Sequence, residues 1–171
     1  MNIFILDRDQ ELAAKYHCDK HIIKMPLEQC QLLSSAHYSS SSTIPLEGIY
    51  KKTHYNHPCA IWARKTRGNY LWLTSFTHSL CVEYTFRYAR LHKCFTDVLP
   101  ILMENIPSGI DSSLEVTPFA QAMPEQYKDS DPVIAYRRYY LEEKSHLFSW
   151  QKRRVPYWVE DNEQNLLSSV H

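Results

Sequence analysis

Polar side chains recur at alternating steps of four and three residues along one segment of the chain: His17, His21, Lys24, Glu28, Gln31 and Ser35. These steps place all six side chains on one face of a helix. An amine beside a carboxylate and an imidazole can perform nucleophilic and acid–base steps, so Lys24, Glu28 and His21 are candidate catalytic residues. A solvated helix face is the alternative interpretation of the same pattern.

The other side of this helix is apolar, and we expect it to pack in the core: Ile22, Ile23, Leu27, Cys30 and Leu33. Lys24 and Glu28 form an i,i+4 pair in the less favourable order, which stabilises an exposed helix by only about 0.2–0.5 kcal/mol. The value of this pair is therefore chemical rather than structural.

A metal site is a competing interpretation of the same helix. His17 and His21 lie one turn apart, and helical His pairs at this spacing bind zinc. Further histidines and cysteines could add ligands: His54, His57, Cys59, His92 and Cys94. The spacing matches no recognised zinc framework. A zinc-stabilised domain stays open as an alternative at this point, and the leading interpretation has no metal and no small-molecule cofactor.

Cations alternate with aromatic rings in three segments, although the net charge of the chain is zero. Phosphate backbones attract the cations and unstacked bases stack on the rings, so duplex DNA is the expected partner. The candidate DNA-binding residues are Arg64, Lys65, Arg67, Arg87, Arg137, Arg138, Lys152, Arg153, Arg154, Tyr157 and Trp158.

An all-α fold is expected, because glycine and valine are scarce and apolar residues recur at helical spacing. Residues 2–6 are expected to form a short strand or an extended N-terminal arm. Pro26 should kink the first long helix or divide it in two, and a break near Gly68 should divide the longest. The expected helices span residues 10–17, 19–38, 58–92, 96–105 and 131–150. Residues 39–43 should be a loop, 151–158 an extended, basic and aromatic tail, and 159–171 loosely ordered.

The length of the chain, 171 residues, predicts one compact helical domain over residues 1–171. A run of about 18 apolar residues is absent, so no transmembrane helix is expected. Five cysteines without a C-x-x-C pair favour reduced thiols and a cytoplasmic location. We expect a monomer that does not associate with membranes.

Three blocks of the sequence resemble a known family. Asp19-Lys20-His21, with Glu28 seven residues after the histidine, resembles the first helix of the phage pyrimidine-dimer DNA glycosylases of the endonuclease V type. His57 before an aromatic-rich helix that ends with residues 83–88 is similar to the central helix of that family. Residues 154–158 are similar to its basic, aromatic C-terminus.

The resemblance implies an all-helical enzyme without metal that binds kinked duplex DNA and extrudes a base. Such an enzyme cleaves the glycosidic bond through an imine formed by an amine. In the family this amine is the N-terminus of the chain, and a helix glutamate assists. Glu28 matches that glutamate, and Asp19 and His21 belong to the matching motif.

The sequence departs from the family at its N-terminus. Asn2 is too large for efficient removal of the initiator methionine, so Met1 should keep its amine. An α-amine has an ordinary pKa of about 7.7–8.0 and a lysine one of about 10.4, so Lys24 would need a lowered pKa to compete. Lys20 and a charged His21 would lower that pKa, and Glu28 would raise it. We expect Met1 to be the nucleophile if the arm folds back towards Glu28.

The leading hypothesis is a DNA glycosylase with AP lyase activity on thymine-type bases, hence a repair enzyme. One alternative is a non-catalytic phage DNA-binding or host-takeover protein with the same fold. Another is an enzyme that modifies thymine in DNA. A phage-encoded protein of this kind would act in the cytoplasm of the host bacterium.

Overall fold

The computed structural model describes residues 1–38 and 46–168. Over these residues the fold is all-helical, as the sequence predicted. The α-helices are α1 (Gln10–Tyr16), α2 (Asp19–Ala36), α3 (Pro58–Ala63), α4 (Arg67–Tyr88), α5 (Lys93–Asp97), α6 (Leu99–Glu104), α7 (Pro132–Lys144) and α8 (Tyr157–Ser168). Two 3₁₀ turns flank α7, and no helix in the described ranges is long and apolar enough to cross a membrane. The expected loop at residues 39–43 lies outside the described residues.

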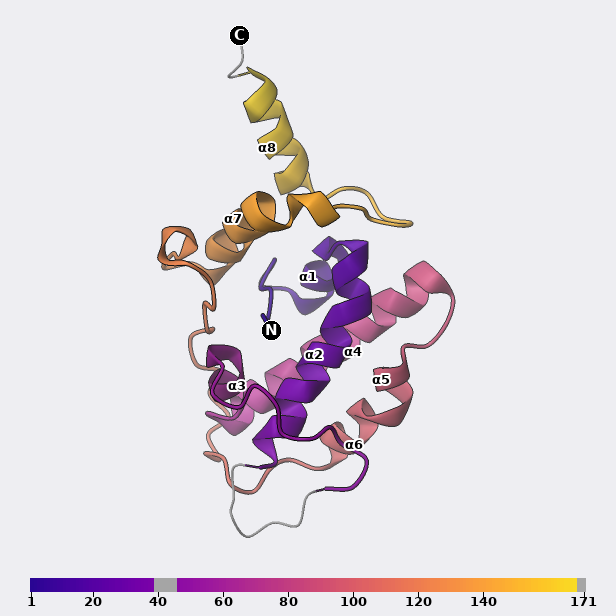
Figure 1. Cartoon of the computed structure of the whole chain (residues 1–171), viewed down its shortest axis with the longest axis vertical. Coiled ribbons are helices and arrows are strands. Elements are labelled where there is room, and N and C mark those ends of the chain that lie inside the picture. The colour runs from indigo at the N-terminus through magenta and orange to yellow at the C-terminus, as the bar shows by residue number, and fades with distance from the viewer. Residues whose placement is uncertain (39–45, 169–171) are drawn as a thin grey trace.

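Helices α2 and α4 lie side by side and antiparallel at the centre of the fold (Figure 1). Near the middle of α4, the Thr77 hydroxyl donates to the Gln29 side chain at 2.9 Å. Near its start, the hydroxyl of Tyr70 and a ring nitrogen of His37, just beyond α2, are 2.9 Å apart. Helix α1 packs along α4, and α3 packs against α2.

Much of the polar face of α2 points into the protein. His21, Glu28 and Ser35 are buried and only Lys24 is exposed, so the solvated-face interpretation is wrong for most of the stripe. Of the five apolar residues that we expected in the core, Ile22, Cys30 and Leu33 are buried, whereas Ile23 and Leu27 are 47% and 38% exposed. The reason is tertiary, because the N-terminal arm, α3 and α7 cover the polar face.

Pro26 does not divide α2, which continues through it as one element. A break does separate α3 from α4, at residues 64–66, slightly before the position that the sequence predicted. Thr66 caps α4 by accepting a hydrogen bond from the backbone N–H of Asn69 at 3.0 Å. Gly68 lies in the first turn of α4, where a Cβ atom would come within 2.3 Å of the Leu114 carbonyl oxygen. Glycine therefore allows the loop at residues 113–115 to pack on the start of α4.

The C-terminal part begins as the sequence predicted and ends differently. Asp131 caps α7, and Pro132 occupies its first turn. Residues 148–156 form an irregular segment, and the chain then turns into α8 from Tyr157 onward. The extended segment that we expected over residues 151–158 is therefore wrong at Tyr157 and Trp158, which begin a helix. Burial of Val159, which is 1% exposed, anchors the start of this helix.

Residues 2–6 form an extended arm rather than a strand, and Ile3 to Leu6 are buried. The arm runs between α2 and α7 (Figure 1). Phe4 carries most of its aromatic contacts, with rings from both helices around it. The arm thereby becomes part of the core, and its direction sets the position of the chain's first residue.

Candidate active site

The amine of Met1 and the side chains of Lys24 and Glu28 meet at one point on the polar face of α2. The Met1 nitrogen lies 3.7 Å from Glu28 Oε2, and the Lys24 Nζ atom lies 2.9 Å from Glu28 Oε1. The Glu28 side chain is 11% exposed, whereas the Lys24 side chain is 64% exposed. One carboxylate thus faces the N-terminal amine on one oxygen and a solvent-exposed lysine amine on the other.

Two anchors hold the N-terminal arm in this position. Near the amine, the Phe4 ring stacks on His21 with ring centres 4.7 Å apart. Farther along, Arg137 of α7 donates to the Leu6 carbonyl at 2.8 Å and pairs with Asp7 at 3.0 Å. An extended segment fixed at both ends has little freedom, so the Met1 amine is held against Glu28 before any substrate binds.

His21 supports the arm as a neutral ring. The Tyr140 hydroxyl accepts a hydrogen bond from the Cys18 backbone N–H at 2.9 Å, so its own hydrogen is available to the Nδ1 atom of His21 at 2.8 Å. Burial, followed by the nearby His17, lowers the pKa of His21 to about 3. His21 is therefore uncharged near neutral pH, and the charged ring that we expected beside Lys24 is absent.

His17 belongs to the same buried cluster and is also held neutral. Its Nδ1–H donates to the Ala13 carbonyl at 2.7 Å. Burial lowers the pKa of His17 to about 4, and the hydrogen bond to Ala13 opposes this shift. Both histidines of the polar face thus act in packing and hydrogen bonding.

His57 lies near this site, although the sequence analysis named it only as a possible metal ligand and as part of the family resemblance. It caps α3, and its Nδ1 atom accepts a hydrogen bond from the Cys59 backbone N–H at 3.1 Å. Burial lowers the pKa of His57, the positive Met1 terminus lowers it further, and the Glu28 carboxylate opposes both. His57 therefore lies within electrostatic reach of both the Met1 amine and the Glu28 carboxylate. A sequence signal for its position was its place before Pro58 at the start of a helix.

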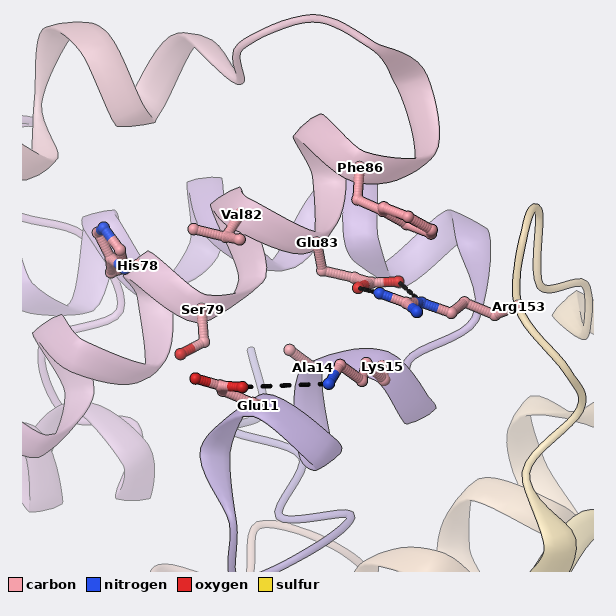
Figure 2. A pocket seen from close by; sticks show the side chains of 9 residues that line it. All are labelled: Glu11, Ala14, Lys15, His78, Ser79, Val82, Glu83, Phe86 and Arg153. Carbon is pink, nitrogen blue, oxygen red and sulfur yellow. Dashed lines mark hydrogen bonds and ion pairs between the residues drawn. The ribbon is translucent and has the colours of Figure 1, made fainter.

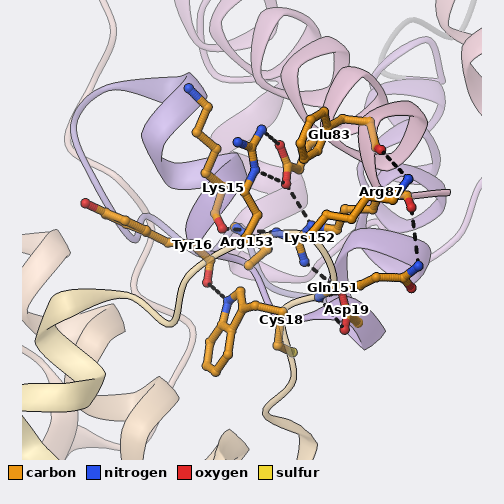
Figure 3. A network of polar contacts seen from close by, with 12 residues as sticks. Lys15, Tyr16, Cys18, Asp19, Glu83, Arg87, Gln151, Lys152 and Arg153 are labelled. Atoms are coloured by element: carbon orange, nitrogen blue, oxygen red, sulfur yellow. Dashed lines mark hydrogen bonds and ion pairs between the residues drawn. The ribbon is translucent and has the colours of Figure 1, made fainter. Parts of the chain in front are cut away.

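Asp19 lies away from Glu28, in a network that fastens the C-terminal segment to the helices (Figure 3). Its carboxylate pairs with Arg87 at 2.9 Å and accepts a hydrogen bond from the Gln151 backbone N–H at 3.0 Å. Arg87 is fully buried and also pairs with Glu83 at 2.7 Å. Arg87 is therefore not placed to contact a phosphate, although the sequence suggested that role.

Arg153 completes this network and closes one end of a groove between α1 and α4 (Figure 2). Its guanidinium binds both oxygens of Glu83, at 3.0 and 2.8 Å, and lies 3.9 Å from the centre of the Phe86 ring. Glu83 raises the pKa of Arg153. Arg153 is thus occupied by a buried carboxylate rather than presented to DNA.

The aromatic tail packs on α7. The guanidinium of Arg137 lies 5.5 Å from the ring centre of Tyr157 and 5.4 Å from that of Trp158. Its Nη1 atom donates to the Tyr157 hydroxyl at 3.0 Å, and Trp158 is only 8% exposed. This cluster ties the start of α8 to the helix that anchors the arm.

Most of the remaining candidates for DNA binding are exposed or half-buried. Arg64 stacks on the Tyr55 ring at 3.7 Å, and Arg138 pairs with Asp129 at 3.6 Å. The others are exposed: Lys65, Arg67, Lys152 and Arg154. Of the predicted DNA-binding residues, Arg87, Arg137 and Arg153 are thus paired with carboxylates of the protein itself.

The histidines and cysteines do not assemble into a metal centre in the part of the chain that the structure describes. No group of three His, Cys, Asp or Glu side chains there is arranged to hold a metal ion. His17 and His21 use a ring nitrogen each on a protein partner. All five cysteines are buried free thiols.

A comparison with protein-family models matches residues 1–96 to the pyrimidine dimer DNA glycosylase family. The match covers more than half of the 171 residues, so the chain belongs to this family. It includes Met1, Lys24 and Glu28 and extends into α5, whereas α7 and α8 lie beyond it. Searches of curated proteins and of solved structures found no match.

Proposed function

We propose that the protein is a DNA glycosylase with AP lyase activity that acts on thymine-type pyrimidines in duplex DNA. The Met1 amine is the nucleophile, and Glu28 assists it. The observation that carries this proposal is the Met1 amine held 3.7 Å from the Glu28 carboxylate, within the segment that matches the family. An amine beside a carboxylate is the pair that imine chemistry requires.

The reaction follows from this pair. The unprotonated amine bonds to C1′ of the sugar while the bond from C1′ to the base breaks, and the base leaves with the electron pair. The Glu28 carboxylate stabilises the positive charge that develops on the sugar. Glu28 then accepts a proton from the new C–N centre and passes it to O4′ as the C1′–O4′ bond breaks, so that the sugar ring opens and an imine links Met1 to the DNA. The carboxylate regenerated in this way can abstract a C2′ proton, which expels the 3′ phosphate and breaks the strand.

Met1 is a better candidate nucleophile than Lys24. Its amine is attached to an arm that Phe4 and Arg137 fix, whereas the Lys24 side chain is mostly in solvent. A group held in its reacting position gains an advantage of orientation that a flexible side chain lacks. Lys24 pairs with the second oxygen of Glu28 at 2.9 Å, where it helps to orient the carboxylate.

The decisive experiment replaces Glu28 by Gln and measures both chemistry and binding. Glu28→Gln should reduce base release from dimer-containing duplex by at least about a hundredfold, a loss typical of a removed acid–base group. The Kd for duplex should change little. Glu11→Gln is the matched control, because Glu11 is an exposed glutamate that pairs only weakly with Lys15, at 4.0 Å. Full activity in Glu28→Gln would refute the assignment.

Borohydride trapping on abasic duplex identifies the amine. Peptide mapping should locate the adduct at Met1, an uncleaved N-terminal tag should prevent trapping, and Lys24→Ala should leave it detectable. Trapping that survives the tag and disappears in Lys24→Ala would make Lys24 the nucleophile. DNA binding without trapping in the unmodified chain would instead favour the non-catalytic DNA-binding alternative.

A further inference from the structure

The outer side of α2 carries an unusual combination of exposed apolar and basic side chains. Ile23 and Leu27 are one turn apart and are 47% and 38% exposed. Lys20 and Lys24 are exposed and share this side at the same helical spacing. Isolated exposed apolar residues are ordinary, but an apolar pair flanked by cations on one stripe is typical of a binding surface.

The turn after α4 extends this surface. Ala89 adopts a left-handed conformation that ends α4, and His92 then caps α5. The Nδ1 atom of His92 accepts from the Cys94 backbone, so its Nε2–H can donate to the Ile23 carbonyl at 3.0 Å. This bond fixes the turn beside α2. The turn presents Leu91, which is 56% exposed, between two exposed cations, Arg90 and Lys93.

The surface borders the candidate active site. Lys24 contacts the Glu28 carboxylate, and Leu27 precedes Glu28 in α2. Because the Lys24 side chain is 64% exposed, it connects the buried carboxylate to solvent on this side of the helix. A sugar that approaches Glu28 from this side would carry its DNA strand across the outer side of α2.

We propose that duplex DNA docks on this surface and that Ile23 and Leu27 wedge between base pairs next to the extruded base. The surface, here called the α2 outer surface, consists of Lys20, Ile23, Lys24, Leu27, Arg90, Leu91 and Lys93. Apolar side chains that enter the minor groove unstack neighbouring bases and kink the duplex, and flanking cations neutralise phosphates. The proposal rests on the proposed function, because it supplies the surface that brings a base to Glu28.

The chemistry of the surface favours DNA over a protein partner. Its cations alternate with apolar side chains over a short distance, which suits a phosphate backbone on either side of an opened base step. Several of the basic residues that the sequence suggested for DNA binding are instead bound within the protein, including Arg87, Arg137 and Arg153. The α2 outer surface therefore supplies cations for phosphate contacts beside the candidate active site at Glu28.

The wedge is tested with a duplex that carries 2-aminopurine beside an abasic site. Binding of the unmodified chain should raise the fluorescence, because the reporter base loses its stacking. The double variant Ile23→Ala/Leu27→Ala should lose most of this rise and bind about tenfold more weakly. Alanine preserves the helix, and both positions are exposed, so folding should survive. Leu114→Ala is the matched control, because Leu114 is an apolar residue 70% exposed on a distant loop.

The cations are tested by the salt dependence of binding. Lys20→Gln together with Lys93→Gln should reduce the slope of log K against log salt by about two, at roughly 0.9 per lost phosphate contact. Lys128→Gln is the control, because Lys128 already pairs with Glu125. Unchanged fluorescence, affinity and salt slope in these variants would overturn the proposal, as would a chain that binds no duplex.

The outcomes separate the surface from the chemistry. If the surface is right and the proposed reaction is wrong, the surface variants weaken binding while the unmodified chain gives no imine. If the reaction is right and the surface is wrong, trapping and Glu28 dependence remain and the surface variants bind like the unmodified chain.

Discussion

Lowering the pH from 7 to 5 should destabilise the fold strongly, because His17 and His21 are buried as neutral rings. Their pKa values in the folded protein are about 4 and about 3, against 6.5 for an ordinary histidine. The unfolded chain therefore binds more protons than the folded chain below pH 6.5. The stability from these rings is fully present above that pH and is lost as the pH falls. At pH 5 each ring costs about 2 kcal/mol, so the pair costs about 4 kcal/mol.

Urea unfolding followed by circular dichroism at pH 7 and pH 5 measures this loss. A typical domain has a free energy of unfolding of about 5–15 kcal/mol, so the change should be plain. His21→Phe keeps a ring to stack on Phe4 but removes the titrating group, and should halve the difference between the two pH values. His146→Gln is the control, because His146 is exposed. Equal stability at both pH values, or an undiminished difference in His21→Phe, would refute the reasoning.

Three further predictions concern packing, the arm and the surface. Gly68→Ala should lower the free energy of unfolding by about 1–3 kcal/mol, because the new Cβ atom would lie within 2.4 Å of backbone oxygens. Thermal unfolding measures this loss, and an unchanged unfolding temperature would contradict the prediction. Arg137→Gln should release the arm, so that an acylating reagent labels the Met1 amine several-fold faster by mass spectrometry; equal labelling would show that Arg137 is not needed to hold it. Arg154→Gln should reduce the slope of log K against log salt for duplex binding by at most about one. Arg153→Gln should instead lower the free energy of unfolding, because Arg153 binds a buried carboxylate. A larger change of the salt slope for Arg153→Gln than for Arg154→Gln would reverse these roles.

Local sequence signals determined much of the helical framework. Asp131 and Pro132 specified the start of α7, because a carboxylate cap and a fixed proline φ act over one turn. The break between α3 and α4 was also readable from the chain, within a few residues. The spacing of Lys24 and Glu28 placed an amine beside a carboxylate, because i,i+4 geometry is a property of the helix itself.

The sequence could not decide which side of α2 faces the core. A stripe with histidines and a glutamate is usually solvated, and Ile23 and Leu27 are usually buried. Ile22, Cys30 and Leu33 are buried as expected, but His21 and Glu28 are buried as well and Ile23 and Leu27 are exposed. The difference arises because the arm and α7 supply partners for the polar face, such as the Tyr140 hydroxyl for His21, 119 residues apart in the chain.

Large separations along the chain also explain why the sequence did not reveal the roles of the arginines. Arg153 and Glu83 are separated by 70 residues, and Arg87 and Asp19 by 68, so their pairing exists only after the helices have packed. A basic cluster in a sequence predicts DNA when its charges remain in solvent, and burial beside carboxylates removes that condition. The sequence alone determined most of the helices, with α8 as the exception, and the residue types of the candidate site. Tertiary packing decided which charges are buried in pairs and that the Met1 amine lies at Glu28, because contacts between distant segments set both.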